Sequence, residues 1–422
     1  MTIIKPLKLT RSTEVDSLPN YQGSNACDTP LVNCFWGWSD SGRTKLESGD
    51  FSKLLQEAFG NRLKFNELTF EPELYEEPIP GQIIERLSTH LSERGYKIHK
   101  EAASDGLIVA AQKHSFHPVS EYLIKIENDP SIVPIELDQV SSNYLGTKNP
   151  LYDLMLKTAL VAAVARNLRR GIKFDSCLVL KGKQGIGKSS FFKILAGEDW
   201  FCDTWQDKPQ DLYMAIQRCW LYELAELDYM TSKQEVGKMK ALISSATDTF
   251  RVPYGKTNQP YKRPSIFVGT VNRSDFLNDP DGSRRFWVIE LPNQRLNLIR
   301  LREHRDEIWK AALIAYRKGF RLFLPPKEQL LSNQNNVLFE AEHPFFATLS
   351  DWLVDPLNSD TVEDGFSTED ALISSGCRCQ GQIRGNDSKE AANCLRQLGF
   401  EKDKHQRYKD GIKQPRKWRR SN

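Results

Sequence analysis

The chain has 422 residues, enough for about two to four domains, and its 39% hydrophobic and 27% charged content is typical of a soluble globular protein. It contains no run of about 18 apolar residues, which excludes a membrane-spanning helix, and no apolar segment typical of a secretory signal near the N-terminus. We therefore expect a cytoplasmic protein without a membrane partner, whose eight scattered cysteines are reduced.

The N-terminal part is predicted to contain a tail and a domain of uncertain role. Residues 1–30 are polar and rich in turn-forming residues, so we expect a flexible tail. Residues 31–148 are expected to form a mainly helical collar or oligomerisation domain, because apolar residues recur at helical spacing in 48–63 and 81–96.

Residues 149–325 have the alternation of a central α/β domain. Asn149-Pro150 is a start signal for a long apolar helix that ends before Gly171. From there to Leu291, buried strands alternate with helical stretches, which predicts a parallel sheet. Residues 326–360, which begin with a stretch rich in Pro and Asn, are expected to be a linker or helical connector.

The segment "GKQGIGKS", Gly182 to Ser189, satisfies the phosphate-binding pattern G-x-x-x-x-G-K-[ST] completely. An apolar strand precedes it and a helix follows it, as this motif requires. Lys188 is predicted to reach the β- and γ-phosphates of ATP, and Ser189 to bind Mg²⁺. The predicted ATP-binding residues are Gly182, Lys183, Gln184, Gly185, Ile186, Gly187, Lys188, Ser189 and Ser190.

Polar groups follow two further apolar strands. In "CWLYELAELD" four apolar residues lead into Glu223, and Glu226 follows three residues later. A buried carboxylate is costly unless a cation compensates it, so Glu223 is predicted to face Mg²⁺ or the attacking water, with Glu226 as the alternative. The third strand, "SIFVGTVN", ends in Asn272, whose amide could hydrogen-bond water or the γ-phosphate.

Two adjacent arginines, Arg284 and Arg285, follow an acidic turn and precede the apolar run "FWVIEL". Arginine is the usual residue that stabilises charge on a transferring phosphoryl group, so one of them is predicted to act on ATP. If the backbone here is extended, the two side chains point to opposite faces. Ion pairs with Asp279 or Asp281 are the alternative.

Four segments, "VLKGKQGIGKSSFFKILAG", "LYELAELD", "DTFRVPYGKTNQPYKRPSIFVGTVN" and "DPDGSRRFWVIEL", together resemble the virulence-associated protein E-like family from about Pro150 to Leu324. The resemblance implies an AAA+-like P-loop core related to superfamily 3 helicases of mobile elements. It also implies a homo-hexamer that couples ATP hydrolysis to movement on DNA. Asn272 would be its sensor residue, and Arg284 or Arg285 would be a finger acting on a neighbouring subunit's ATP.

The resemblance further implies a β-hairpin before the sensor strand, which would project into the central pore. The hairpin would lie within "FRVPYGKTNQPYKRPSIF", with "GKTNQ" as its turn. Its prolines suit an edge hairpin. Lys256, Lys262 and Arg263 would then be exposed cations that contact DNA phosphates without reading bases.

Residues 361–422 are predicted to form a small basic module. The last 22 residues hold nine Lys or Arg against three acids, which indicates a polyanionic partner. A helix over 387–399 is followed by two short strands around a "KDG" turn, an order that resembles a winged-helix module.

These features predict a DNA helicase or translocase that hydrolyses ATP with Mg²⁺ and serves replication of a phage, plasmid or other mobile element. Its partners would be single-stranded or forked DNA, a homo-hexamer, and a primase or polymerase. The alternative is an ATP-gated DNA-binding initiator, loader or regulator that does not unwind DNA. We expect no primer synthesis, because residues 1–145 lack a clear acid pair or Cys/His spacing.

Overall fold

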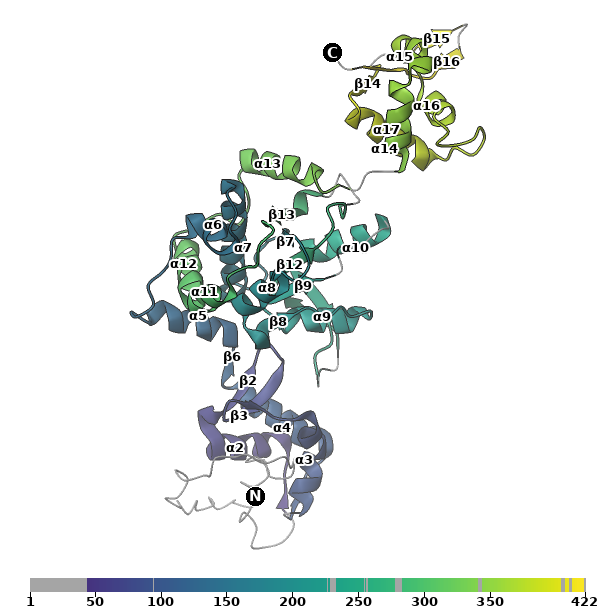
Figure 1. Cartoon of the computed structure of the whole chain (residues 1–422). Coiled ribbons are helices and arrows are strands. Elements are labelled where there is room, and N and C mark those ends of the chain that lie inside the picture. The colour runs from purple at the N-terminus through teal and green to yellow at the C-terminus, as the bar shows by residue number, and fades with distance from the viewer. Residues whose placement is uncertain are drawn as a thin grey trace. The chain divides into compact units, whose positions relative to one another are not determined.

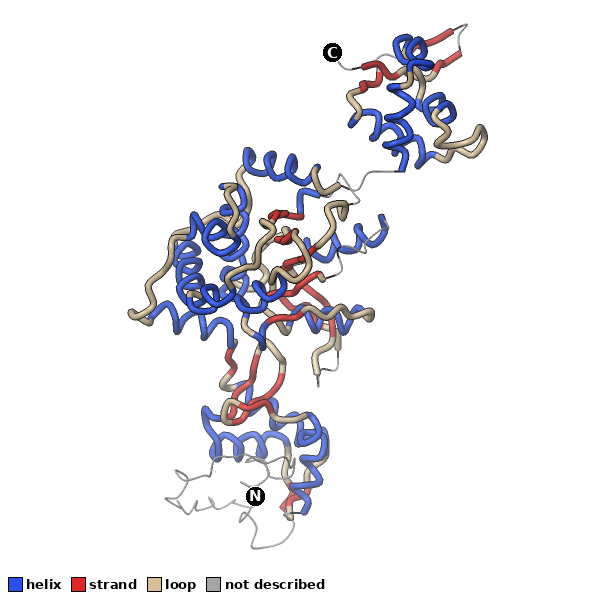
Figure 2. The backbone as a smooth tube through the Cα atoms, viewed as in Figure 1, coloured by secondary structure: helices blue, strands red, loops and turns tan. Residues whose placement is uncertain are grey.

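The protein is described from a computed structural model, shown as a cartoon in Figure 1 and as a backbone tube in Figure 2. It divides into two compact units, one comprising Met1–Tyr122 with Arg251–Asn258 and the other comprising Leu123–Phe250 with Gln259–Asn422. The structure describes residues 44–93, 95–225, 227, 233–253, 255, 257–277, 283–340, 344–403, 407–409 and 412–420. The tail predicted over residues 1–30 lies outside these ranges.

The described part of the first unit combines the α-helices α2, α3 and α4 with a small sheet of short strands that the sequence did not predict. Phe51, Leu55 and Phe59 recur every fourth residue of α2 and are buried, which explains why this segment forms an amphipathic helix. The sheet has the strand order β4-β3-β2-β6, and a further parallel pair joins β1 and β5. The elements are α2 (Ser48–Phe59), α3 (Gly81–Glu93), α4 (Lys100–Gln112), β1 (Thr44–Lys45), β2 (Leu63–Asn66), β3 (Glu71–Leu74), β4 (Glu77–Pro78), β5 (Tyr96–Lys97) and β6 (Ser115–Phe116).

The second unit contains the predicted parallel sheet. Its strand order is β13-β7-β12-β9-β8, and all neighbouring pairs are parallel. The central strand β12 is buried along its whole length, as expected for a strand covered on both faces. The strands are β7 (Cys177–Lys181), β8 (Phe201–Cys202), β9 (Leu221–Leu224), β12 (Ile266–Val271) and β13 (Phe286–Glu290).

Helices cover both faces of this sheet (Figure 1). On one face, apolar side chains of α9 and α10 form a core with β7, β9, β12 and β13. On the other face, α7, α8 and α12 enclose the opposite side chains of β7, β9 and β12. The helices are α5 (Pro118–Asn128), α6 (Val140–Leu145), α7 (Pro150–Leu168), α8 (Lys188–Ala196), α9 (Pro209–Gln217), α10 (Lys233–Ser244), α11 (Leu298–Glu303) and α12 (Arg305–Arg317).

The long helix α7 confirms the start signal in the sequence. The Asn149 side chain accepts a hydrogen bond from the Leu151 N–H at 3.0 Å, and Pro150 occupies the first turn. Next to α7, the indole rings of Trp220 and Trp309 stack at 4.0 Å between centroids and join the sheet to α12. Among the described residues, no helix has both the length and the apolar character that a membrane span requires.

The N-terminal boundary of the second unit differs from the predicted 148/149, since the division falls between Tyr122 and Leu123. The reason is the contact of the end of α5 with α12. Arg317 forms an ion pair with Glu127 at 3.0 Å, and the Lys310 ammonium donates to the Asp129 carbonyl at 2.6 Å. The segment before α7 therefore packs with the parallel sheet's own helices.

The predicted connector also contributes to the sheet body. Pro326–Val337 forms helix α13, whose first-turn proline is compatible with helix initiation. The buried Asn336 amide donates to the carbonyls of Ser283 at 2.7 Å and Phe286 at 2.9 Å, while Asn335 donates to Val288 at 2.9 Å. These bonds tie α13 to the start of β13, so the body extends beyond residue 325.

A C-terminal module, residues 344–420, has a separate apolar core that includes Phe366 and Trp418. Phe366 bridges Trp418 in an antiparallel sense, and β14 pairs with β17. Trp418 is fully buried, and its indole N–H donates to Thr368 at 2.9 Å, so this aromatic residue of the basic tail is part of the core. The elements are α14 (Pro344–Val354), α15 (Ser359–Asp364), α16 (Thr368–Ser374), α17 (Gly385–Gln397), β14 (Phe400–Lys402), β15 (Arg407–Lys409), β16 (Ile412–Gln414) and β17 (Trp418–Arg420).

Candidate functional site

The glycine-rich segment forms the loop between β7 and α8, at the carboxyl edge of the parallel sheet. Gly185 and Gly187 have φ values of +78° and +102°, a region that only glycine adopts readily. A Cβ atom on Gly182 would lie 2.7 Å from the Ile186 Cδ1 atom. Gly185 and Gly187 are thus required by the backbone path of the loop, whereas a side chain at Gly182 would displace the end of the Ile186 side chain.

Lys188 and Asn272, which are 84 residues apart in the sequence, meet at this loop. The Lys188 ammonium donates to the Asn272 side-chain oxygen at 2.8 Å and to the carbonyls of Gly182 at 2.8 Å and Lys183 at 2.9 Å. Lys188 is buried, whereas Asn272 lies at the exposed end of β12. Three oxygen atoms from the loop and from Asn272 therefore hold the lysine in the centre of the loop.

Glu223 lies beside the same loop and accepts two hydrogen bonds at one oxygen. The Ser189 hydroxyl donates to Glu223 Oε1 at 2.8 Å, and the Thr270 hydroxyl donates to the same atom at 2.5 Å. The other oxygen, Oε2, is buried and accepts no hydrogen bond from the described residues. The site thus presents one carboxylate oxygen that is fixed and one that is uncompensated.

The electrostatics of Glu223 follow from this environment. Only 2% of the residue is exposed, and burial raises the pKa of its carboxyl group above the usual value. The hydrogen bonds from Thr270 and Ser189, and the positive charge of Lys188, act in the opposite direction. A nearby cation would remove the cost of the buried negative charge.

Strand register explains how Thr270 reaches the site, and sequence reasoning missed this residue. Val268 of β12 is the register partner of Glu223, and Thr270 lies two residues further along, so its side chain points to the same face. The signal in the sequence was a single hydroxyl within the apolar run "IFVGTV", two residues before Asn272.

The residues at the loop fit a Mg²⁺ ion. Magnesium prefers oxygen ligands and is commonly bound by one or two carboxylates and substrate phosphates. Ser189 supplies a hydroxyl oxygen, and the uncompensated Oε2 of buried Glu223 supplies a carboxylate oxygen. Glu226, the alternative carboxylate, lies outside the described residues, so the order between the two acids stays open.

The two arginines do not lie on an extended backbone, so that expectation is wrong. Ser283–Arg285 forms a 3-10 turn immediately before β13. Arg284 is exposed, whereas Arg285 is half-buried and its Nε donates to the Ser244 hydroxyl of α10 at 2.9 Å. Asp279 and Asp281, the predicted ion-pair partners, lie outside the described residues. The turn orients the two arginines differently, and only Arg284 is exposed.

A hairpin precedes β12 as predicted, but its first strand ends at Phe250, where the predicted segment begins, and one of its cations is buried. β10 (Thr247–Phe250) pairs antiparallel with β11 (Gln259–Lys262). Arg263 is 0% exposed and forms a bidentate ion pair with Asp248, with a further bond to the Leu242 carbonyl at 2.6 Å. The expectation that Arg263 is an exposed DNA-binding cation is wrong, because its guanidinium neutralises a buried carboxylate.

Of the other two predicted hairpin cations, Lys262 is exposed at the end of β11. Lys256 lies outside the described residues. Of the three predicted cations, Lys262 is therefore the described one that could meet a phosphate.

Fold and site together define a mixed α/β protein with a glycine-rich loop, a lysine and a buried carboxylate at the carboxyl edge of a parallel sheet. The model of the virulence-associated protein E-like domain matches residues 134–340, so the family resemblance is confirmed and the chain carries this domain. The match begins before Pro150 and includes α13, in agreement with the contacts of that helix.

Two solved structures are similar to parts of the chain. The A form of the apo NrS-1 C-terminal region has a TM-score of 0.45 and 12% identity, with 89% of this chain and 100% of that chain covered. A further apo structure of the NrS-1 C-terminal region has a TM-score of 0.41 and 15% identity, with coverages of 70% and 78%. No curated protein matches the chain.

Proposed function

We propose that this protein is an ATPase of the superfamily 3 helicase type, which hydrolyses ATP with Mg²⁺ and moves on DNA during replication of a mobile element. The observation that carries the proposal is the convergence of Lys188, Ser189, Glu223 and Asn272 at one loop. A glycine-rich loop followed by a helix N-terminus is well suited to bind phosphates through its backbone N–H groups.

Each residue of the site has a distinct role in this proposal. Lys188 exchanges its bonds to the loop carbonyls and Asn272 for the β- and γ-phosphates. Ser189 and Glu223 would hold Mg²⁺, which would neutralise charge on the phosphates. Once Lys188 has turned to the phosphates, the Asn272 amide is free to orient the attacking water or the γ-phosphate.

Thr270 acts in this proposal as a positioning residue. Its hydroxyl and that of Ser189 both bind Glu223 Oε1, so the carboxylate is held in one orientation with Oε2 directed to other ligands. Preorganisation of this kind lowers the reorganisation needed when charge develops during the reaction.

The arginine turn and the hairpin supply the parts that a ring would need. Arg284 is exposed and can reach a neighbouring subunit's nucleotide, whereas Arg285 supports the turn through Ser244. Lys262 and Lys256 would line a pore and contact single-stranded or forked DNA. A homo-hexamer and a primase or polymerase partner complete the proposal, and the C-terminal elements have the order expected of a winged-helix module.

Replacement of the loop lysine tests the nucleotide site. We expect Lys188→Ala to abolish ATP hydrolysis, because Lys188 is the lysine buried at the centre of the loop, whereas Lys183 is exposed. The matched control is Lys193→Ala, which removes a half-exposed lysine of α8 whose acid partner is Glu198. Hydrolysis by the Lys188 variant at the rate of the control would contradict the assignment.

The alternative function is an ATP-gated initiator, loader or regulator that binds DNA without unwinding it. A strand-displacement assay on a forked duplex distinguishes the two. Displacement that requires ATP and Lys188 supports a helicase, whereas ATP-dependent DNA binding without displacement supports the alternative.

A further inference from the structure

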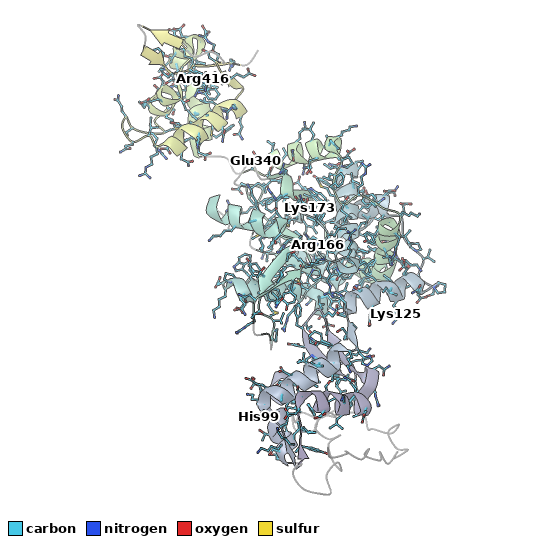
Figure 3. The ribbon with its side chains drawn as sticks, turned by 180° about the vertical axis from the view of Figure 1, so that it is seen from behind. His99, Lys125, Arg166, Lys173, Glu340 and Arg416 are labelled. Carbon is cyan, nitrogen blue, oxygen red and sulfur yellow. The ribbon has the colours of Figure 1, made fainter. Side chains whose placement is uncertain are left out.

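Two cations of the C-terminal module lie over the buried Trp418, and a third is close enough to repel one of them. The Arg396 guanidinium, at the end of α17, lies 5.6 Å from the centroid of the indole ring. The Lys402 ammonium, at the end of β14, lies 5.4 Å from the same centroid. Arg416, which precedes β17 and is labelled in Figure 3, is exposed. We call Arg396, Lys402 and Arg416 the Trp418 cation cluster.

The cluster has neutral hydrogen-bond partners, unlike other cations of this module. Arg396 donates to the Asn393 side chain at 2.8 Å, and Lys402 donates to the Thr368 hydroxyl at 3.3 Å. In contrast, Arg378 pairs with Asp387 at 3.0 Å, and Arg419 pairs with Asp403 at 3.6 Å. Asp387 and Asp403 of this module are thus already engaged by other arginines.

The positive charges of the cluster repel one another, and the pKa of Lys402 reflects this repulsion. Partial burial lowers the pKa of Lys402, and the positive charges of Arg416 and Arg396 lower it further. A bound anion would oppose both effects, since an opposite charge favours the ionised ammonium. The cluster is therefore better matched to an anionic ligand than to open solvent.

We propose that the Trp418 cation cluster is a binding site for the backbone phosphates of duplex DNA. The choice of DNA as the polyanion rests on the proposed function; the preference for a phosphate backbone rests on the geometry. Cations at a helix end, at the end of β14 and just before its partner strand β17 can follow a backbone without reading bases.

A duplex is favoured over a single strand because the aromatic ring next to the cluster offers no platform for base stacking. Proteins that bind single strands stack bases on exposed aromatic rings. Trp418, the ring that Arg396 and Lys402 lie over, is fully buried in the module's core. The charged groups of Arg396 and Lys402 lie over this indole ring, and the buried ring is not accessible to a base.

The test is the salt dependence of duplex binding by the full chain without nucleotide. Arg396→Gln with Lys402→Met removes two charges but keeps most of each side-chain volume. The logarithm of the association constant falls linearly with the logarithm of the salt concentration, and each lost phosphate contact makes this slope less steep by about 0.9 for duplex DNA. For the double variant we therefore expect the magnitude of the slope to decrease by roughly two. The loss should be equal for two unrelated duplex sequences, because phosphates carry no sequence information.

Two further variants make the result specific. Arg86→Gln with Lys100→Met makes the same change in net charge at exposed positions of α3 and α4, and should leave the slope unchanged. Arg416→Gln alters only an exposed side chain, so it tests the cluster even if the double variant folds poorly, and should lower the slope by about one.

An unchanged slope in Arg416→Gln and in the folded double variant would overturn the proposal. Equal losses in the cluster and control variants would overturn it too, because they would reveal a bulk charge effect. A loss confined to single-stranded DNA would reassign the site. ATP hydrolysis without DNA should be the same in all variants, so failure of the proposed ATPase activity would be seen separately from failure of this site.

Discussion

Thr270→Val is the substitution that most directly tests how Glu223 is held. It replaces the hydroxyl group by a methyl group of similar size inside β12, so little space is opened. It removes the 2.5 Å hydrogen bond to Glu223 Oε1 and leaves Ser189 as the remaining donor to that oxygen among the described residues. Folding should therefore be affected less than the orientation and ionisation of the carboxylate.

The size of the effect follows from the bond that is lost. A hydrogen bond to a charged group contributes about 1.5–3 kcal/mol, which corresponds to roughly 10- to 150-fold in rate. The bond from Thr270 lowers the pKa of Glu223, so its removal raises that pKa further. Since the ionised carboxylate is the active form in our proposal, the acidic limb of the pH–rate profile should move to higher pH.

Steady-state ATPase measurements at saturating ATP and Mg²⁺ across the acidic and neutral range would detect both changes. Thr270→Ser keeps the hydroxyl group and should retain the wild-type rate and profile. If Thr270→Val has the wild-type kcat and an unmoved acidic limb, Thr270 does not position Glu223. A fall in Tm without a moved limb would indicate a purely structural role.

Three further substitutions have defined outcomes. Glu223→Gln should abolish hydrolysis yet raise the Tm of the ligand-free protein, because the raised pKa of Glu223 means that its ionised form destabilises the fold. This gain in Tm should vanish at acidic pH, where the Glu223 carboxyl group is protonated, and calorimetry across a range of pH would check it. Arg263→Met should lower the free energy of unfolding, measured by urea titration, by about 3–5 kcal/mol, because it leaves the buried Asp248 carboxylate without a cation. If Arg263 were instead an exposed DNA-binding residue, its replacement would hardly change the free energy of unfolding. Arg284→Ala should reduce kcat about 10³-fold or more with ATP affinity nearly intact, and Arg285→Ala should have a smaller effect. Mixed with inactive Lys188→Ala, the Arg284 variant should regain partial activity if the finger acts between subunits; a co-assembled but inactive mixture would exclude this.

The central part of the site could be predicted because its signals are local. The loop from Gly182 to Ser189 is specified by glycine positions that set the backbone path, and Glu223 and Asn272 each follow an apolar strand. Parallel strands bring their carboxyl ends to one edge, so residues far apart in the sequence meet there.

Other features depend on contacts that no local pattern reveals. Arg263 looks like any hairpin cation in the sequence, and only its pairing with Asp248, 15 residues away, makes it a core residue. Thr270 differs from its neighbours only by one hydroxyl, and strand register determines what that hydroxyl meets.

Helix α13 shows the limit of compositional reasoning. The Pro and Asn content of this segment suggested a connector, but Pro326 is tolerated in the first turn. Asn335 and Asn336 face the carbonyls at the start of β13 instead of solvent, so they fix the helix to the sheet. Composition alone cannot distinguish an asparagine in a loop from one that binds buried backbone.

Release of phosphate from ATP by the purified chain, with and without single-stranded DNA, tests the central claim most directly. The account predicts Mg²⁺-dependent hydrolysis that DNA accelerates and that Lys188→Ala abolishes, while the variant stays folded. A folded wild-type protein that binds ATP with Mg²⁺ but releases no phosphate, in the presence or absence of DNA, would contradict it.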